Sequence, residues 1–191
     1  MVSEAPMEEA PGGKRPAAEG WFVVNAREAQ WIHNERFGAA VTFEGSERLG
    51  YSSGWPDDEL RFTQLGINIQ VMWPGQPNGY YHAEEGQEDF LVLRLEFLLL
   101  VEGEERPLKA WDFVHCPPWT EHVFVATGDG PCVFVGVGAR NAGEGIVYPV
   151  SELALRHGVG VTGETTSGEV AHAISPKTSP GAYPEGLLSD G

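Results

Sequence analysis

Short apolar runs, separated by residues that favour turns, fill the middle of the chain. The most strand-like stretch runs from Asp89 to Val101, and three shorter β-rich runs follow at Phe113–Cys116, Val123–Val125 and Val133–Val137. Before them, Phe62–Met72 alternates in part between apolar and polar residues, as a strand with one buried face does. Because turns and not long helices separate these runs, the pattern predicts an all-β sandwich, jelly roll or barrel.

Clusters of turn-forming residues predict how the runs connect. Gly128-Asp129-Gly130 between two runs is a hairpin signal, and Asp89–Val101 divides into a second hairpin with Arg94-Leu95-Glu96 at its tip. Trp21–Val24 is predicted as a first strand. Ser151–His157 is predicted as a short final helix with its first residue as the N-cap.

Composition divides the chain into a folded middle and two ends. Residues 1–19 are rich in Pro, Ala, Gly and Glu and bury little apolar surface, so they are predicted to form a disordered tail. Residues 176–191 have a similar composition. We therefore expect one domain at residues 20–158, followed by an extended or disordered tail at residues 159–191.

The net charge of the chain limits the kinds of molecule that it is expected to bind. With 28 acidic and 12 basic residues, the chain has a formal net charge of −16, which repels nucleic-acid phosphates and anionic lipid surfaces. We therefore expect no nucleic-acid and no membrane partner. The N-terminus lacks a basic segment followed by an apolar run, so we expect a cytoplasmic location. Two cysteines, Cys116 and Cys132, are too few for a disulfide framework and are expected as buried free thiols.

Three potential metal ligands share one face of an extended segment. His82, Glu84 and Glu88 are separated by even numbers of residues, and such residues project from the same side of a strand. One imidazole and two carboxylates suit a divalent metal, and His122, beside a later β-rich run, would supply a second imidazole. The alternatives are that both histidines are structural core residues and that the carboxylates form a solvated turn.

Two neighbours of the second histidine are further candidates. His115 and Cys116 precede it, and a cysteine ligand would favour zinc or iron. Because successive strand residues point to opposite faces, at most one of the two faces the site.

These residues, together with their spacing, resemble the cupin superfamily over residues 65–140. The first cupin motif is G-x5-H-x-H-x3-4-E-x6-G: His82 takes the first His, Glu84 stands at the second, and Glu88 takes the Glu. The second motif is G-x5-P-x-G-x2-H-x3-N, in which His122 takes the His. The chain departs from these motifs at the Gly positions, occupied by Gln76, Leu95, Trp111 and Trp119, and at the closing Asn, occupied by Ala126.

The resemblance implies a cupin-type double-stranded β-helix, a jelly-roll barrel with short flanking helices. It implies one divalent transition metal (Fe, Mn, Zn or Ni), held by His82, Glu84, Glu88 and His122. The function expected is that of a metal-dependent enzyme, such as an oxygenase, isomerase or lyase, acting on a small polar molecule such as a sugar or organic acid. The alternative is a non-catalytic cupin that binds or senses a small ligand. A homodimer is also expected, with Trp21–Val24 as a candidate edge strand.

Overall fold

The structure is a computed structural model that describes residues 1–43, 62–140 and 145–187. Strands dominate it and the helices are short. The strands are β1 (Met7–Ala10), β2 (Gly13–Pro16), β3 (Trp31–Asn34), β4 (Gly38–Phe43), β5 (Leu65–Met72), β6 (Ala83–Glu84), β7 (Glu88–Arg94), β8 (Phe97–Val101), β9 (Glu104–Leu108), β10 (Phe113–Cys116), β11 (His122–Ala126), β12 (Cys132–Ala139), β13 (Ile146–Val147) and β14 (Ser179–Gly181). The helices are α1 (Glu152–Arg156) and α2 (Gly168–Ala171).

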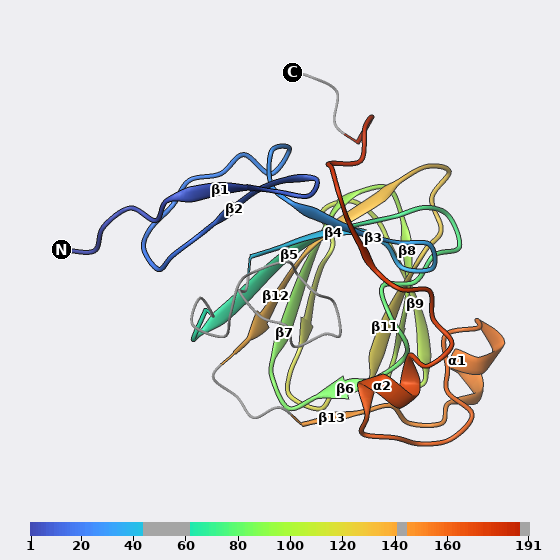
Figure 1. Cartoon of the computed structure of the whole chain (residues 1–191). Coiled ribbons are helices and arrows are strands. Elements are labelled where there is room, and N and C mark those ends of the chain that lie inside the picture. Colours follow the sequence, from blue (N-terminus) through green and yellow to red (C-terminus); the bar gives the residue numbers. More distant parts are fainter. Residues whose placement is uncertain (44–61, 141–144, 188–191) are drawn as a thin grey trace.

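Two antiparallel sheets face each other and form the barrel. The larger sheet has the order β10-β7-β12-β5-β4-β3-β14 and the smaller has the order β11-β8-β9, while β6 pairs with β13 at one end (Figure 1). Aromatic rings from both sheets fill the space between them, with ring centroids 4.7–6.2 Å apart among Phe90, Phe97, Phe124 and Phe134. The predicted all-β class is confirmed, and the apolar runs are the strands that build this core.

The two predicted hairpins are wrong in their pairing. β7 pairs with β10 and β12, whereas β8 pairs with β11 and β9, so Leu95-Glu96 carries the chain from one sheet to the other. Gly128–Gly130 likewise connects β11 of the smaller sheet with β12 of the larger. Turn-forming residues indicate where the chain reverses direction. Which strands then pair with each other depends on how the barrel closes.

The two crossings between the sheets pack against each other. The backbone N–H groups of Thr127 and Gly128 both donate to the carbonyl oxygen of Glu96, at 3.0 and 3.2 Å. A side chain at position 128 would bring its Cβ to 2.7 Å from the Cβ of Leu95, so this close approach requires the glycine. A hairpin does occur between β8 and β9, where Glu102 and Gly103 have φ of 49° and 77°, as a two-residue type I′ loop demands.

The N-terminal segment differs from the sequence prediction. Only Trp21 of the predicted first strand makes a β-bridge, to Glu4. Within the predicted tail, β1 and β2 form a hairpin that lies beside the barrel (Figure 1), and Lys14 on β2 forms an ion pair with Glu28 at 2.8 Å. Hydrogen bonds between backbone groups hold this segment in place. Its low apolar content gives no indication of them.

The C-terminal segment also contains more structure than predicted. β14 pairs with β3 at the edge of the larger sheet, and the ring of Tyr183 lies edge-on to Trp31 at 5.5 Å. Leu187 is buried in the same cluster. The predicted final helix is confirmed as α1, and the Ser151 hydroxyl accepts the N–H of Ala154 at 3.2 Å as its N-cap.

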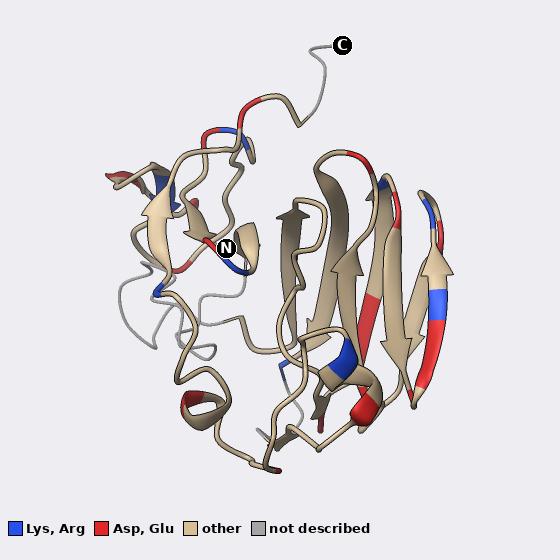
Figure 2. Cartoon of the chain, turned by 90° about the vertical axis from the view of Figure 1, so that its right-hand side faces the viewer, with Lys and Arg blue, Asp and Glu red and all other residues tan. Residues whose placement is uncertain are grey.

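Two other expectations can be compared with the structure. Cys116 and Cys132 are buried and unbonded to each other, as predicted. The Lys and Arg residues are scattered in the view of Figure 2, in which no basic stripe crosses the described part of the chain. Within that part, neither helix has the length and apolar character needed to cross a bilayer.

Left-handed backbone marks the positions where the cupin motifs have glycine. Leu95, Trp111 and Trp119 have φ of 58°, 75° and 67°, a region that side chains with a Cβ disfavour by about 1–2 kcal/mol. The first glycine position of the first motif falls at Gln76. The neighbouring Gly75 adopts the positive φ there, at 84°. The chain therefore keeps the motif's backbone at these turns although the residues differ.

Replacing Trp111 by asparagine should relieve this strain. The Trp111 side chain is 76% exposed and loses little packing, and asparagine tolerates the left-handed region. We expect the free energy of unfolding to rise by about 1 kcal/mol, measured by urea denaturation. Trp21→Asn is the matched control, because Trp21 is half exposed with an ordinary φ and its replacement should not stabilise the protein. Equal effects of the two substitutions would contradict the strain interpretation.

Candidate metal centre

A backbone bridge brings two histidines together at one end of the barrel. The N–H of His122 donates to the carbonyl oxygen of His82 at 2.8 Å, and the reverse hydrogen bond is 3.2 Å long. Residues paired in this way project to the same side, and the two ring centroids lie 5.1 Å apart. His122 begins β11, whereas His82 directly precedes β6, so the site joins the smaller sheet to the end of the barrel.

Glu88 completes a cluster of three potential ligands. It begins β7, shares the interior face with Phe90, and places Oε2 at 3.3 Å from Nε2 of His122. One ligand atom from each of His82, Glu88 and His122 lies within 4.8 Å of the others. Two ligand atoms that each lie about 2.1 Å from an ion are at most about 4.2 Å apart. A small inward movement of these side chains would therefore suffice for coordination.

Both histidines are held in the tautomer that a metal requires. Nδ1 of His82 lies 2.7 Å from the carbonyl oxygen of Tyr80, and Nδ1 of His122 lies 3.0 Å from that of Thr120. Because a carbonyl oxygen only accepts, each Nδ1 carries the proton and each Nε2 keeps a lone pair when the ring is neutral. Such a hydrogen bond at the other ring nitrogen is typical of metal-binding histidines.

Nε2 of His122 is the atom that best tests the fit to a metal. The His122 side chain is 1% exposed, and this nitrogen has no hydrogen-bond partner among the described residues. Its nearest acidic neighbour, Oε2 of Glu88, offers lone pairs and not a proton when it is ionised. An unpaired buried nitrogen is costly, and a cation held between it and Glu88 would supply the missing partner. The residues present therefore fit a divalent metal.

Glu84 lies next to the cluster of three and not within it. Its Oε1 is 3.5 Å from Nε2 of His82. Burial by itself raises the pKa of this carboxyl, but the hydrogen bond to His82 and the charge of that ring hold the pKa below its ordinary value. The structure thus brings three of the four predicted ligands into mutual reach, with Glu84 beside one of them.

Burial and nearby charges shift the pKa values of His82 and His122 in opposite directions. Burial opposes protonation of His82, but the adjacent carboxylates of Glu84 and Glu88 raise its pKa to about 9. Burial and the neighbouring charge of His82 lower the pKa of His122 to about 4. At neutral pH only one of the two adjacent rings can be protonated, and that ring is His82, which faces Glu84.

The two further candidates lie outside the cluster. His115 is exposed on the outer face of β10, where its Nδ1 is 2.6 Å from Oδ1 of Asp89. Cys116 faces the core opposite Glu88, and burial, together with the charge of Glu88, raises the pKa of its thiol to about 12. A cysteine ligand binds as the thiolate, so this residue is poorly suited to bind metal.

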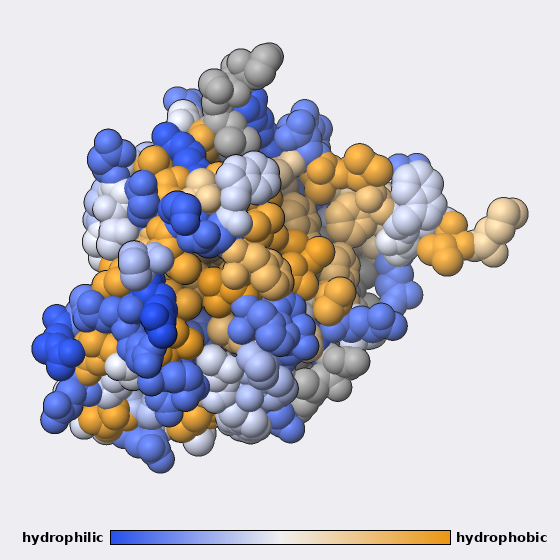
Figure 3. Space-filling view, turned by 180° about the vertical axis from the view of Figure 1, so that it is seen from behind, coloured by the Kyte–Doolittle hydropathy of each residue, from blue (hydrophilic) through white to orange (hydrophobic). Residues whose placement is uncertain are grey.

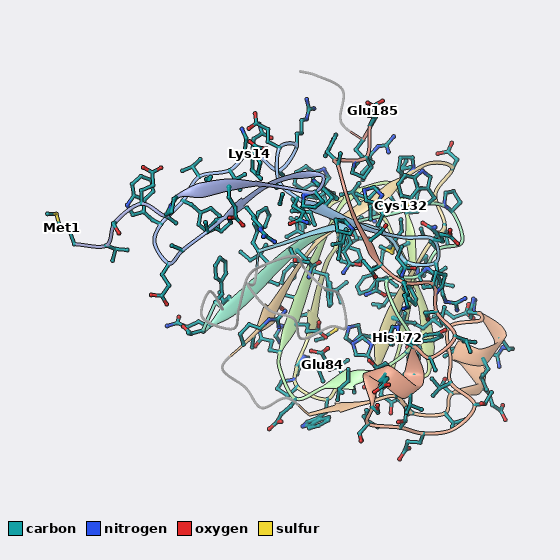
Figure 4. All side chains as sticks on the ribbon, viewed as in Figure 1. Met1, Lys14, Glu84, Cys132, His172 and Glu185 are labelled. Atoms are coloured by element: carbon teal, nitrogen blue, oxygen red, sulfur yellow. The ribbon has the colours of Figure 1, made fainter. Side chains whose placement is uncertain are left out.

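Sequence reasoning gave no role to the residues that adjoin the site from the C-terminal segment. The Tyr148 ring lies 5.7 Å from the His82 ring, and the His172 ring lies 6.0 Å from Tyr148 and 5.0 Å from Tyr80. Figure 4 shows His172 and Glu84 toward the same end of the barrel. Both Tyr148 and His172 follow the recognised motifs, so motif spacing offers no signal for them.

Comparison with known proteins agrees with this geometry. Residues 68–138 match the family described as the cupin domain, and this range includes His82, Glu88 and His122. Residues 68–138 are a cupin domain. The predicted cupin superfamily and double-stranded β-helix fold are thereby confirmed, and the cupin match ends before Arg140, Tyr148 and His172.

Three solved structures similar to this cupin domain each cover less than half of the chain. A candidate sugar phosphate isomerase of Acidithiobacillus ferrooxidans is 26% identical over 44% of this chain and 54% of its own, with a TM-score of 0.40. A double-stranded β-helix protein of Klebsiella pneumoniae is 25% identical over 44% and 74%, with a TM-score of 0.41. KdgF of Halomonas is 22% identical over 41% and 72%, with a TM-score of 0.39. The comparison with curated proteins gave no match.

The opposite pKa shifts of the two histidines can be measured directly. In metal-free protein, we expect His82 to stay protonated through neutral pH and to lose its proton near pH 9, whereas His122 stays neutral until the pH falls to about 4. Imidazole nitrogen shifts, followed by NMR from pH 4 to 9, check both values. Titration of His122 near pH 6.5 would contradict its burial beside a charged ring.

Proposed function

We propose that this cupin domain binds one divalent transition metal through His82, Glu88 and His122, with Glu84 as the fourth ligand. The observation that carries the proposal is the buried Nε2 of His122, which lacks a hydrogen-bond partner within the described part of the chain and lies 3.3 Å from a carboxylate oxygen. Nitrogen and oxygen ligands of this kind suit Fe, Mn, Zn or Ni. Glu84 would join the set by turning its carboxylate from His82 toward the ion.

We further propose that the bound metal serves an enzyme acting on a small polar organic molecule. Two imidazoles and two carboxylates leave two positions open on an octahedral ion, where it would polarise a carbonyl or carboxylate oxygen of the substrate. The chain's own contribution is to fix both imidazoles through the carbonyl oxygens of Tyr80 and Thr120. The aromatic rings of Phe90 and Tyr148 lie against them.

His122→Ala should remove most of the bound metal while the barrel stays folded. The apolar core persists without this ring, whereas the metal loses a ligand that is held in place. Metal content per chain, measured by mass spectrometry of elements after dialysis, should be close to one in the parent protein and fall at least about tenfold in the variant. Circular dichroism checks the fold.

Glu85→Ala is the matched control for this experiment. Glu85 adjoins Glu84, but its Oε2 accepts the N–H of Gly145 at 3.2 Å, away from the two histidines. This variant should keep its metal. A parent protein without stoichiometric metal would refute the metal proposal and favour a metal-independent binding protein. Metal together with oxygen uptake would identify an oxygenase.

We also propose that two copies associate through the outer face of the larger sheet. The register of β10, β7, β12 and β5 aligns apolar residues in adjacent rows on this face, and several are well exposed. The view from behind shows apolar residues across the middle of the molecule (Figure 3). In a chain of net charge −16, this largely apolar face, where Asp89 and His115 lie in one row, is where two copies would repel least. The residues are Leu65, Ile67, Ile69, Leu91, Leu93, Phe113, Val135 and Val137.

Leu93→Glu should convert the dimer into a monomer. A charge within the proposed interface would have to lose its water without gaining a partner. Light scattering after size-exclusion chromatography at micromolar concentration should show about half the parent mass. Leu155→Glu on α1 is the matched control, because both leucines are 38% exposed, and it should remain dimeric. A monomeric parent protein would contradict the proposal.

A further inference from the structure

The interior face of the larger sheet has an apolar part and a polar part. In the apolar part, Met72, Val92 and Phe134 point inward and are completely buried in the aromatic core. Residues that pair directly on neighbouring strands project to the same side, so the register shows which other side chains face inward. Gln70 pairs with Phe134 and therefore faces the interior, although it is polar.

The next row of paired residues extends the polar part toward the candidate metal centre. The strands that contribute to it are β4, β5, β12 and β7, which lie side by side (Figure 1), and the residues are Thr42, Asn68, Gly136 and Phe90. The Phe90 ring lies 5.4 Å from the His122 ring, so this row faces the interior. Glu88 lies two residues from Phe90 on β7 and shares its face.

The polar part of the interior is accessible and not closely packed. Thr42, Asn68 and Gln70 are half-buried although they face inward, and Glu88 is half-buried as well. The inward residues of the apolar part, in contrast, are completely buried. Inward side chains that remain partly exposed line a space that a small molecule can enter, and polar groups in such a space fix its orientation.

The amide of Asn68 is the group in this lining that lacks a partner. A Cβ on Gly136 would lie 3.0 Å from Oδ1 and 3.2 Å from Nδ2 of Asn68, so the amide lies over this glycine and extends from β5 across β12. Oδ1 is buried and has no hydrogen-bond partner in the part of the chain that the structure describes. Such an oxygen is costly, and a turn about the Cβ–Cγ bond would present it to a donor in the accessible space.

Strand geometry gives the distance from this amide to the candidate metal ligands. Gly136, beneath the amide, is one strand away from β7 and two residues away from the row of Glu88. Because strands are about 4.8 Å apart and residues about 3.4 Å apart along a strand, the two positions are separated by about 8 Å. With C–C bonds of about 1.5 Å, a ligand of about six carbon atoms spans this distance.

An acceptor without a partner selects a ligand that donates. Carbonyl and carboxylate oxygens only accept, whereas a hydroxyl group both donates and accepts. The adjacent side chains of Thr42 and Gln70 are uncharged and also do both. A ligand ammonium, in contrast, would be attracted to the carboxylates of Glu84 and Glu88. The lining around Asn68 therefore suits a hydroxyl group.

We infer that Asn68 binds a hydroxyl group of a polyhydroxylated ligand, a sugar or sugar acid, whose carbonyl or carboxylate oxygen would reach the metal. This inference rests on the proposed metal site and names the class of its substrate. Asn68 is then a specificity-determining residue, which favours hydroxylated molecules over deoxygenated ones of the same length.

Three probes with the same carbon chain and the same carboxylate test this class. Gluconate carries hydroxyl groups, 6-aminohexanoate carries a terminal ammonium, and hexanoate carries neither. Each probe is titrated calorimetrically into the purified full chain with the metal that the chain retains. We expect gluconate to bind about fivefold or more tightly than either of the other two probes.

Asn68→Leu should remove this preference. Leucine has a similar size and no hydrogen-bonding group, so the ratio of gluconate to hexanoate affinity should fall about fivefold or more. Because Oδ1 has no partner among the described residues, the variant should be at least as stable as the parent protein in urea denaturation. A merely structural asparagine would lower stability on replacement and weaken both probes equally. Asn68→Ala repeats the test with a smaller side chain.

Gln30→Leu is the matched control. Its Oε1 is also buried without a hydrogen-bond partner within the described residues. Gln30 directly precedes β3, and its N–H donates to the carbonyl oxygen of Lys14 on β2, so it lies against the N-terminal hairpin. This variant should bind all three probes as the parent protein does.

The outcomes separate this inference from the metal proposal. Metal content is measured on every sample, and Asn68→Leu should keep it. Parent protein without metal would refute the metal proposal, yet a preference for gluconate that depends on Asn68 would still support the inference. The inference is refuted if gluconate does not bind at millimolar concentration, if hexanoate or 6-aminohexanoate binds as tightly, or if both Asn68 variants keep the preference.

Discussion

The antiparallel bridge between His82 and His122 is the interaction on which the candidate site depends. The two residues are forty positions apart in the chain, and their backbones exchange two hydrogen bonds where the smaller sheet meets the end of the barrel. The aromatic core between the sheets fixes the distance between β7 and β11, and thereby the distance from Glu88 to His122. Core packing therefore also determines the geometry of the candidate metal site, because the rings that fill the barrel set the width of the site.

The turns of this barrel impose a conformation that its residues do not favour. Leu95, Trp111 and Trp119 adopt positive φ at positions where glycine would do so at no steric cost. Packing and hydrogen bonding in the surrounding strands must compensate for the cost of this backbone conformation. At Leu95 the compensation is visible, since its side chain packs on the core while the turn lies against Gly128.

Local patterns in the sequence predicted the elements better than their partners. Alternation located the strands, and the shared parity of His82 and Glu88 placed them in one cluster with His122. The hairpin predicted between β7 and β8 was wrong, because the residues of a turn do not encode which strand each strand pairs with when the barrel closes. Tyr148 and His172 were missed because they follow the motifs, and only the fold brings their rings toward His82.

The edges of the two sheets bear on how copies of this protein could meet. β14 borders the larger sheet and contains Pro180, and β9 borders the smaller sheet and contains Pro107. Proline has no N–H to offer an incoming strand, so neither border is a good template for continuing the sheet. The C-terminal segment that supplies β14 thus acts as a terminator of sheet growth. Association through a flat face would leave these two proline borders free.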